Sequence, residues 1–158
     1  MELNRNFAIY SLANLNAAQL EELQDSINSE VLTDKMTTSN SRLAPQPDFS
    51  GRTLRDVYDH HIATRDEHDW MDPLYFIVAD QEDWKTRGLL AVYLEAGLDD
   101  EDDRIGVGRC GFDMADTWGV NFSVANEDWM DLKEAEQHEW GGDNPYEEDE
   151  KTKDDGVE

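Results

Sequence analysis

Residues 74–79 read Leu-Tyr-Phe-Ile-Val-Ala, an unbroken apolar run that directly follows Asp72-Pro73. A strand with one face in water alternates apolar and polar residues, whereas a strand covered on both faces is apolar throughout. The run is also too short for a typical helix of a folded domain. It therefore predicts a central strand that is buried on both faces of a sheet.

Two further strands are expected after this run. Residues 89–94 (LLAVYL) form a second apolar run, and residues 104–110 (RIGVGRC) form a weaker one in which Ile105 and Val107 alternate with glycines. The short segment between them has the composition of a turn, so the two strands should pair as a hairpin. Residues 7–12 (FAIYSL) form either a strand or a helix.

Helical periodicity appears on both sides of the central run. Leu20, Leu23 and Ile27 recur at spacings of three and four with acidic residues between them, which predicts an amphipathic helix over roughly 17–31. A second helix is expected at about 51–66.

Capping residues mark the starts of two helices. Thr53 and Asp56 have the spacing of a capping box at the start of the second helix. Asn126 can cap a last helix, in which Trp129 and Leu132 share one side. Residues 111–123 are expected to be irregular or partly helical.

These elements predict a single α+β domain with a sheet of three or four strands, packed by two or three helices. A stretch rich in Thr, Ser and Asn with two prolines suggests a linker or long loop. The last residues carry eight acidic side chains against two lysines, a composition typical of disorder. The expected division is a strand and helix segment over 1–32, the linker over 33–50, the core over 51–140 and an acidic disordered tail over 141–158.

The charge of the chain is strongly negative and unevenly distributed. In total, 38 Asp and Glu face 13 Lys and Arg, for a net charge of −25. Residues 1–94 carry 16 acidic and 8 basic residues (net −8), and residues 95–158 carry 22 and 5 (net −17). Direct contact with nucleic-acid phosphates or an anionic membrane is disfavoured, because both need clustered Lys and Arg. Basic protein surfaces are the natural partners.

The compartment of the protein and its use of cofactors are predicted from features that the sequence lacks. Cys110 is the only cysteine, so no disulfide can form within the chain. No run approaches the length of a membrane span, and the first residues lack the pattern of a signal peptide. We expect a cytoplasmic or nuclear protein with no cofactor and no metal.

The densest acidic run was tested as a calcium site. In an EF-hand loop that starts at Asp99, the position of the invariant glycine holds Arg104 and the closing glutamate position holds Cys110, so the match fails. The run is instead a solvated turn and a candidate contact surface. The candidate binding residues are the acids of this turn and two acids of the last helix: Asp99, Asp100, Glu101, Asp102, Asp103, Asp131 and Glu134.

An alternative site is a cluster of imidazoles and carboxylates, groups that suit a transition metal. Its members are Asp59, His60, His61 and His68. Adjacent histidines on a helix point about 100° apart, so His60 and His61 would not easily share one ion. His61 lies on the apolar side of its helix and is expected to be a hydrogen-bonded core residue, with His60 exposed.

The segment 118–129 (WGVNFSVANEDW) resembles a small domain of unknown function found in uncharacterised bacterial and fungal proteins. In that family a strand is followed by a tryptophan and then by an Asn-Leu-Ser-Ile-Ala-Asn-Met-Asp-Phe-like segment that opens a helix. The resemblance covers about 85–140 and departs at Glu127, where the family has an apolar residue. It implies an α+β fold with Trp118 and Trp129 in the core. The family has no assigned activity, so the resemblance implies no function. The matching residues are Trp118, Asn121, Ser123, Ala125, Asn126, Asp128 and Trp129.

Three functional hypotheses fit these patterns. The first is a non-enzymatic acidic binding protein that docks on a basic protein surface, as a nucleic-acid mimic or a toxin-neutralising, immunity-like inhibitor. The second is a small metal-dependent hydrolase or other enzyme that uses the histidine cluster. The third is a structural subunit with tryptophans in an interface. The acidity could also serve solubility alone.

Overall fold

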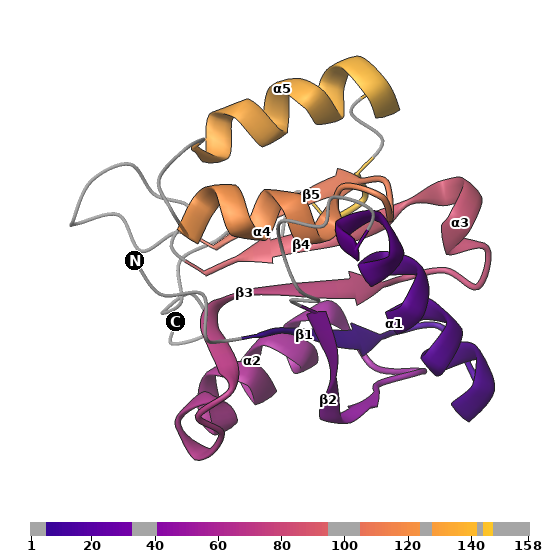
Figure 1. Cartoon of the computed structure of the whole chain (residues 1–158), viewed down its shortest axis with the longest axis vertical. Helices are drawn as coiled ribbons and strands as arrows, with labels where there is room; N and C mark the ends of the chain where they lie inside the picture. Colours follow the sequence, from indigo (N-terminus) through magenta and orange to yellow (C-terminus); the bar gives the residue numbers. More distant parts are fainter. Residues whose placement is uncertain (1–5, 33–40, 95–104, 124–127, 142–143, 147–158) are drawn as a thin grey trace.

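Strand β3 (Met71–Ala79) lies at the centre of a five-stranded sheet with the order β2-β1-β3-β4-β5 (Figure 1). Its last five side chains, residues 75–79, are buried, and they alternate between the two faces of the sheet. The prediction of a central strand with both faces covered is confirmed.

The computed structural model describes residues 6–32, 41–94, 105–123, 128–141 and 144–146. The other elements are β1 (Asn6–Ser11), α1 (Ala17–Leu32), β2 (Ser41–Asp48), α2 (Leu54–Thr64), the 3₁₀ turn η1 (Arg65–Glu67), α3 (Trp84–Arg87), β4 (Leu89–Tyr93), β5 (Gly106–Cys110), α4 (Ala115–Ser123) and α5 (Trp129–Trp140).

The sheet is mixed, and it is larger than the three or four strands expected from the sequence. Strands β1, β2 and β3 are parallel to one another. Strand β4 is antiparallel to β3, and it pairs antiparallel with β5, as expected for these two strands. The additional strand β2 comes from residues 41–48, within the expected linker. It contains Pro45 and Pro47, which an edge strand tolerates because one of its sides has no ladder to complete. The α+β class is confirmed.

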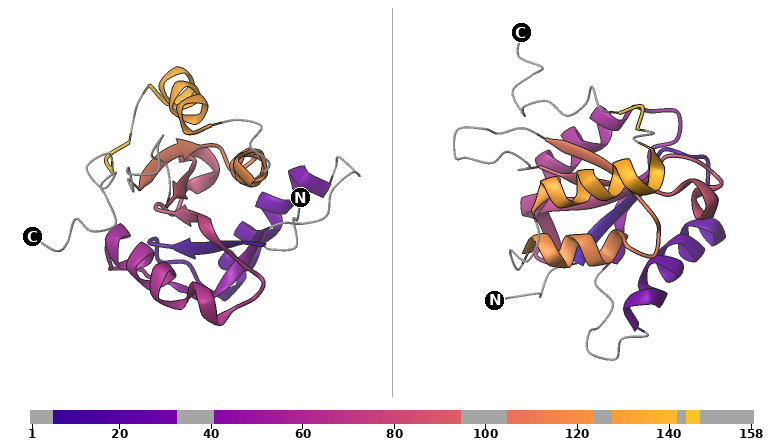
Figure 2. Two further views of the ribbon diagram at one scale, coloured as in Figure 1. Left: turned by 90° about the vertical axis from the view of Figure 1, so that its left-hand side faces the viewer. Right: turned by 90° about the horizontal axis from the view of Figure 1, so that it is seen from above.

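Helices cover both faces of the sheet. Helices α1, α4 and α5 lie on one face and α2 on the other (Figure 2). The sheet has a hydrophobic core on each of its faces, and the side chains of β1 alternate between them. Phe7 and Ile9 pack towards α1 and α4, while Ala8 and Tyr10 pack towards α2. None of the described helices combines the length and apolar character that crossing a bilayer requires.

Helix α1 satisfies backbone groups of the edge strand β2. The side chain of Asn28 accepts a hydrogen bond from the Ser41 N–H (3.2 Å) and donates to its carbonyl (2.9 Å). Gln24 Oε1 accepts from the Leu43 N–H at 2.8 Å. These contacts occupy backbone groups on a sheet edge that could otherwise pair with another strand.

Helix α5 satisfies backbone groups of β5 at the opposite edge of the sheet. Glu136 Oε2 accepts from the Arg109 N–H at 2.7 Å, and Lys133 Nζ donates to the Val107 carbonyl at 3.1 Å. Asn144 donates to both the Val107 carbonyl (2.7 Å) and Glu136 (2.9 Å). Both edges of the sheet are thus protected by side chains of a neighbouring segment rather than by further strands.

Candidate functional site

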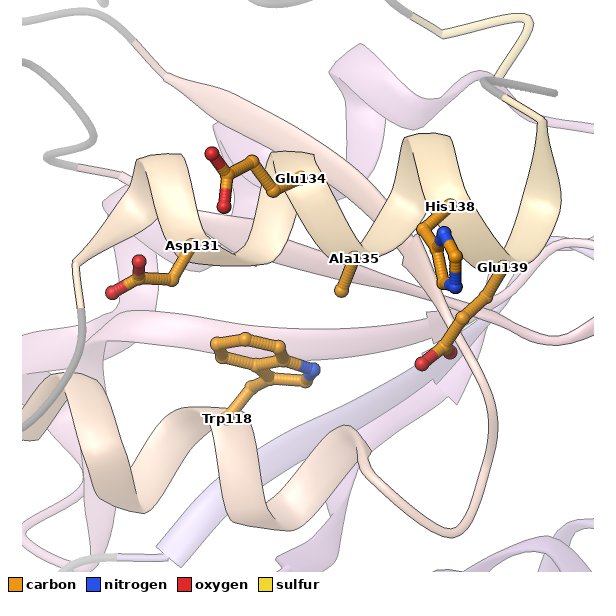
Figure 3. Close-up of a pocket in the computed structure, with 6 residues that line it drawn as sticks. All are labelled: Trp118, Asp131, Glu134, Ala135, His138 and Glu139. Carbon is orange, nitrogen blue, oxygen red and sulfur yellow. The ribbon is translucent and has the colours of Figure 1, made fainter.

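An open groove of about 460 Å³ runs between α4 and α5 (Figure 3). Helix α4 contributes Trp118, and α5 contributes the other lining residues. These recur at spacings of three and four residues, so they share one face of α5. They are Asp131, Glu134, Ala135, His138 and Glu139.

The start of α5 fixes one end of the groove. Asp128 is the N-cap: its carboxylate accepts from the Asp131 N–H (3.2 Å), and the Asp131 carboxylate accepts from the Asp128 N–H (3.0 Å). This reciprocal capping box places Asp131 in the first turn, where the helix dipole favours an anion. Asn126, the cap expected from the sequence, lies outside the described residues.

Trp118 forms the floor of the groove. Its side chain is only 7% exposed and packs against Phe122, with ring centroids 5.8 Å apart. The nitrogen-bearing edge of the indole points along the groove towards His138 and Glu139 (Figure 3). Within the described part of the chain, this N–H has no hydrogen-bond acceptor. The small side chain of Ala135 faces the ring and keeps the space above it open.

Negative charge gathers on the face of the sheet that carries this groove. Helix α1 has no Lys or Arg along its 16 residues, and its Glu21, Glu22 and Asp25 are exposed. Lys85 of α3 forms an ion pair with Glu22. The single cation of α5, Lys133, is bound to the buried Glu136 at 2.8 Å. Besides Asp131, the helix exposes Glu134 and Glu139.

The opposite face carries more of the basic residues. Four arginines lie on or beside α2 and the neighbouring strand β2: Arg42, Arg52, Arg55 and Arg65. Acids are interspersed among them, and Arg52 forms an ion pair with Asp56 at 3.5 Å. The exposed surface is therefore polarised, with the α1/α4/α5 face as its more acidic side.

Two of the candidate binding residues proposed from sequence lie in the groove. Asp131 and Glu134 are both exposed and stand on the same face of α5. The acidic turn Asp99–Asp103 lies outside the described residues. Of the tail expected to be disordered over 141–158, residues 141 and 144–146 are described, and Asn144 is buried against β5 and α5.

His61, from the alternative site, is fully engaged in the core. Its Nδ1 is 2.8 Å from the Tyr10 hydroxyl, and its Nε2 is 3.0 Å from the Asp72 carbonyl. The carbonyl can only accept, so Nε2 carries the proton and Nδ1 accepts from the tyrosine. Burial lowers the pKa of His61 to about 4. The expectation of a hydrogen-bonded core histidine is confirmed.

The rest of the histidine cluster does not form a ligand set. The half-buried His60 packs its ring against Phe49 at 5.2 Å, whereas the sequence suggested an exposed side chain. His68 lies beside Trp70 at 6.2 Å, and Asp59 points to solvent. Across the described ranges, no group of three His, Cys, Asp or Glu side chains could hold a metal ion.

Cys110 is a packed side chain. It is buried at the end of β5, and burial raises its pKa to about 12. The thiolate is the reactive form of cysteine, so this shift holds the residue in its unreactive form at neutral pH.

The carboxyl ends of β1 and β3 are where parallel sheets of this strand order commonly bind ligands. In this protein they are tied together by the main chain. The Leu12 N–H donates to the Ala79 carbonyl at 2.8 Å, and the Phe49 N–H donates to the Ser11 carbonyl at 2.8 Å. The groove between α4 and α5 lies on a face of the sheet, away from this position.

Four lining residues were missed by reasoning from sequence: Trp118, Ala135, His138 and Glu139. The recurrence of polar residues along 131–139 could have indicated an exposed stripe on one face of the helix. The position of that stripe above Trp118 depends on how α4 and α5 pack, which no local pattern reports.

Comparisons with family models, with curated proteins and with solved structures found no match. The resemblance of residues 118–129 to a domain of unknown function stays a prediction. Its structural implication that Trp118 and Trp129 belong to the core agrees with their exposures of 7% and 3%.

Proposed function

We propose that the protein is a non-enzymatic acidic binding protein whose α1/α4/α5 face docks on a basic protein surface. The observation that carries this proposal is the uneven charge of the fold. Exposed acids line α1 and α5, and the one Lys of these two helices is bound to Glu136. Four of the six described arginines lie on or beside α2 and β2, and the acidic face has Lys85 of α3 paired with Glu22.

The partner in this proposal is a nucleic-acid-binding protein or a basic toxin. Such proteins present clustered Lys and Arg to a polyanion, and a folded acidic face can occupy the same surface. Complementary charge mainly accelerates association and makes it sensitive to salt. In this proposal the acidic face competes with nucleic acid for its partner.

The experiment begins with capture of partners on the immobilised full chain and proceeds to titration with each purified partner. Binding should weaken steeply as NaCl rises from about 0.05 to about 0.5 M, and duplex DNA should compete. Glu134→Lys should weaken binding, because it places a cation on the docking face. Asp59→Lys makes the same change of charge at an exposed position on α2 and should leave binding nearly unchanged.

Three results would contradict the proposal. Binding that persists at high salt would show that charge does not drive it. An equal loss with both variants would show that only the total charge matters. Capture of no basic protein would leave solubility as the role of the acidic residues.

A further inference from the structure

We infer that the groove between α4 and α5 receives an arginine side chain of the basic partner, together with the partner's adjoining main chain. This inference rests on the proposed function and specifies which part of the acidic face confers recognition. Its basis is the combination of carboxylates with the indole N–H of Trp118, which opens into the groove from a largely buried side chain and bonds to no described residue.

The carboxylates supply the complement to a cation. Glu134 and Glu139 form no hydrogen bond or ion pair with any other described residue, so both are available. Asp131 uses Oδ2 to accept from the Asp128 N–H, which leaves Oδ1 for a ligand. Asp131 and Glu134 are three residues apart on one helix face, so a planar guanidinium with several donors can bridge them. An ammonium is a single point of charge and fits such a pair less well.

Trp118 distinguishes this groove from a surface that carries acidic residues alone. Its indole N–H is a donor only, in a side chain more than nine-tenths buried, and it points into the groove without an acceptor among the described residues. A ligand that covers this N–H removes the water it can bind, so a ligand that brings its own acceptor is favoured over one that leaves the donor buried without a partner. A peptide carbonyl next to the arginine is such an acceptor, whereas a bare cation brings none.

The shape of the groove suits such a ligand. It is an open groove of about 460 Å³, so it can receive a side chain and a short stretch of main chain that project from a partner's surface. Ala135 faces the Trp118 ring, so the space above the indole depends on a small residue at this position. A larger side chain there would fill the groove without changing its charge.

The test is an NMR titration of the ¹⁵N-labelled full chain with the blocked peptide acetyl-Gly-Arg-Gly-amide. The Trp118 indole resonance is identified by its loss in Trp118→Phe. The arginine peptide should shift this resonance in a saturable manner, and the matching peptide with neutral citrulline should not. The lysine peptide should bind more weakly than the arginine peptide.

Matched variants distinguish the contribution of the groove to peptide binding from that of the overall charge. Glu134→Gln should weaken peptide binding about two- to fivefold, the effect of one exposed ion pair. Glu21→Gln removes one carboxylate from α1 and should have no effect. Ala135→Leu should abolish the shift of the indole. Both glutamates are exposed, so these two variants should fold even if Ala135→Leu does not.

Several outcomes would overturn the inference: no saturable shift of the Trp118 indole, equal binding of the citrulline peptide, or equal losses from Glu134→Gln and Glu21→Gln. If any of these occurs while the full chain still binds basic proteins in a salt-sensitive manner, only the arginine pocket fails. If salt-sensitive binding is also absent, the proposed function fails with it.

Discussion

Arg109 and Asp80 form a two-pronged ion pair in the interior, with Nη1–Oδ1 at 2.7 Å and Nη2–Oδ2 at 3.1 Å. Their side chains are only 3% and 1% exposed. Asp80 follows β3, and Arg109 lies on β5. The register aligns Val78, Leu90 and Arg109 across three strands, so the arginine reaches over β4 on the α2 face of the sheet.

The first prediction concerns this pair. Asp80→Ala should lower the free energy of unfolding by about 3–5 kcal/mol, because it leaves a buried guanidinium without its anion. Replacing both members, as in Asp80→Leu with Arg109→Met, should recover most of this loss, because neither charge is then buried. Urea denaturation of the two variants measures both effects.

Asp83→Ala is the matched control for Asp80→Ala. Asp83 pairs with Arg87 at 3.1 Å, but both side chains are more than half exposed. Loss of an exposed pair of this spacing costs about 0.3–0.5 kcal/mol. Similar losses from Asp80→Ala and Asp83→Ala would show that the Arg109 pair contributes no more than a surface pair.

The parts of the fold that sequence reasoning found are those with a local signal. Strand β3 is an apolar run, β4 and β5 are short apolar stretches that are close in the sequence and pair antiparallel, and α1 and α2 show the periodicity of amphipathic helices. Strand β2 has no such signal, because an edge strand with two prolines shows neither an apolar run nor alternation. Its place depends on pairing with β1, in which Phe7 lies opposite Ser41.

Part of the candidate site could also be predicted from the sequence. Asp131 and Glu134 could be proposed because an acid on a helix whose opposite side is apolar is expected to face water. The unpaired N–H of Trp118 could not be found, because it depends on the packing of α4 beside α5. In the same way, the sequence placed His61 in the core but did not identify Tyr10 and Asp72 as its partners.

The second prediction is that His61 makes the fold sensitive to acid. Burial lowers its pKa from 6.5 to about 4, so between these values the unfolded chain binds a proton that the folded chain does not. The stabilisation is therefore complete above about pH 6.5 and is lost as the pH falls towards 4. From pH 7.5 to 5 this residue should cost about 2 kcal/mol of unfolding free energy.

His61→Gln isolates this effect from the titration of the carboxylates. The variant should be less stable than the native protein at pH 7.5, since it disturbs the contacts with Tyr10 and Asp72. The difference should shrink by about 2 kcal/mol at pH 5, because glutamine does not titrate. Denaturant unfolding at both pH values measures it, and a difference that does not change with pH would contradict the assigned protonation.

The third prediction concerns the protection of β5. Glu136 is 2% exposed and binds the Arg109 N–H, Lys133 and Asn144. Glu136→Leu should lower the free energy of unfolding by about 3 kcal/mol, because the buried donors lose their acceptor. It should also favour self-association, because an uncovered strand edge can pair with another chain.

Urea denaturation and light scattering measure the two consequences of Glu136→Leu. Glu134→Leu, two residues away on the exposed side of the helix, is the control for adding an apolar residue to α5. If the two variants associate equally, the added apolar surface is responsible and the open strand edge is not.

The last prediction tests how closely α4 approaches the sheet. A Cβ on Gly119 would lie 2.7 Å from ring atoms of both Phe7 and Tyr75, whose centroids are 5.1 Å apart. Tyr75 also donates to the Ala115 carbonyl at 2.6 Å, which limits movement of the helix away from the ring. Overpacking of this kind costs about 1–3 kcal/mol, against a gain of up to about 1 kcal/mol for replacing a helical glycine by alanine. Gly119→Ala should therefore lower the free energy of unfolding by about 1–2 kcal/mol in urea, while Thr117→Ala on the same helix changes it by less than about 0.5 kcal/mol. A Gly119→Ala variant as stable as the native protein would show that α4 lies farther from β1 and β3.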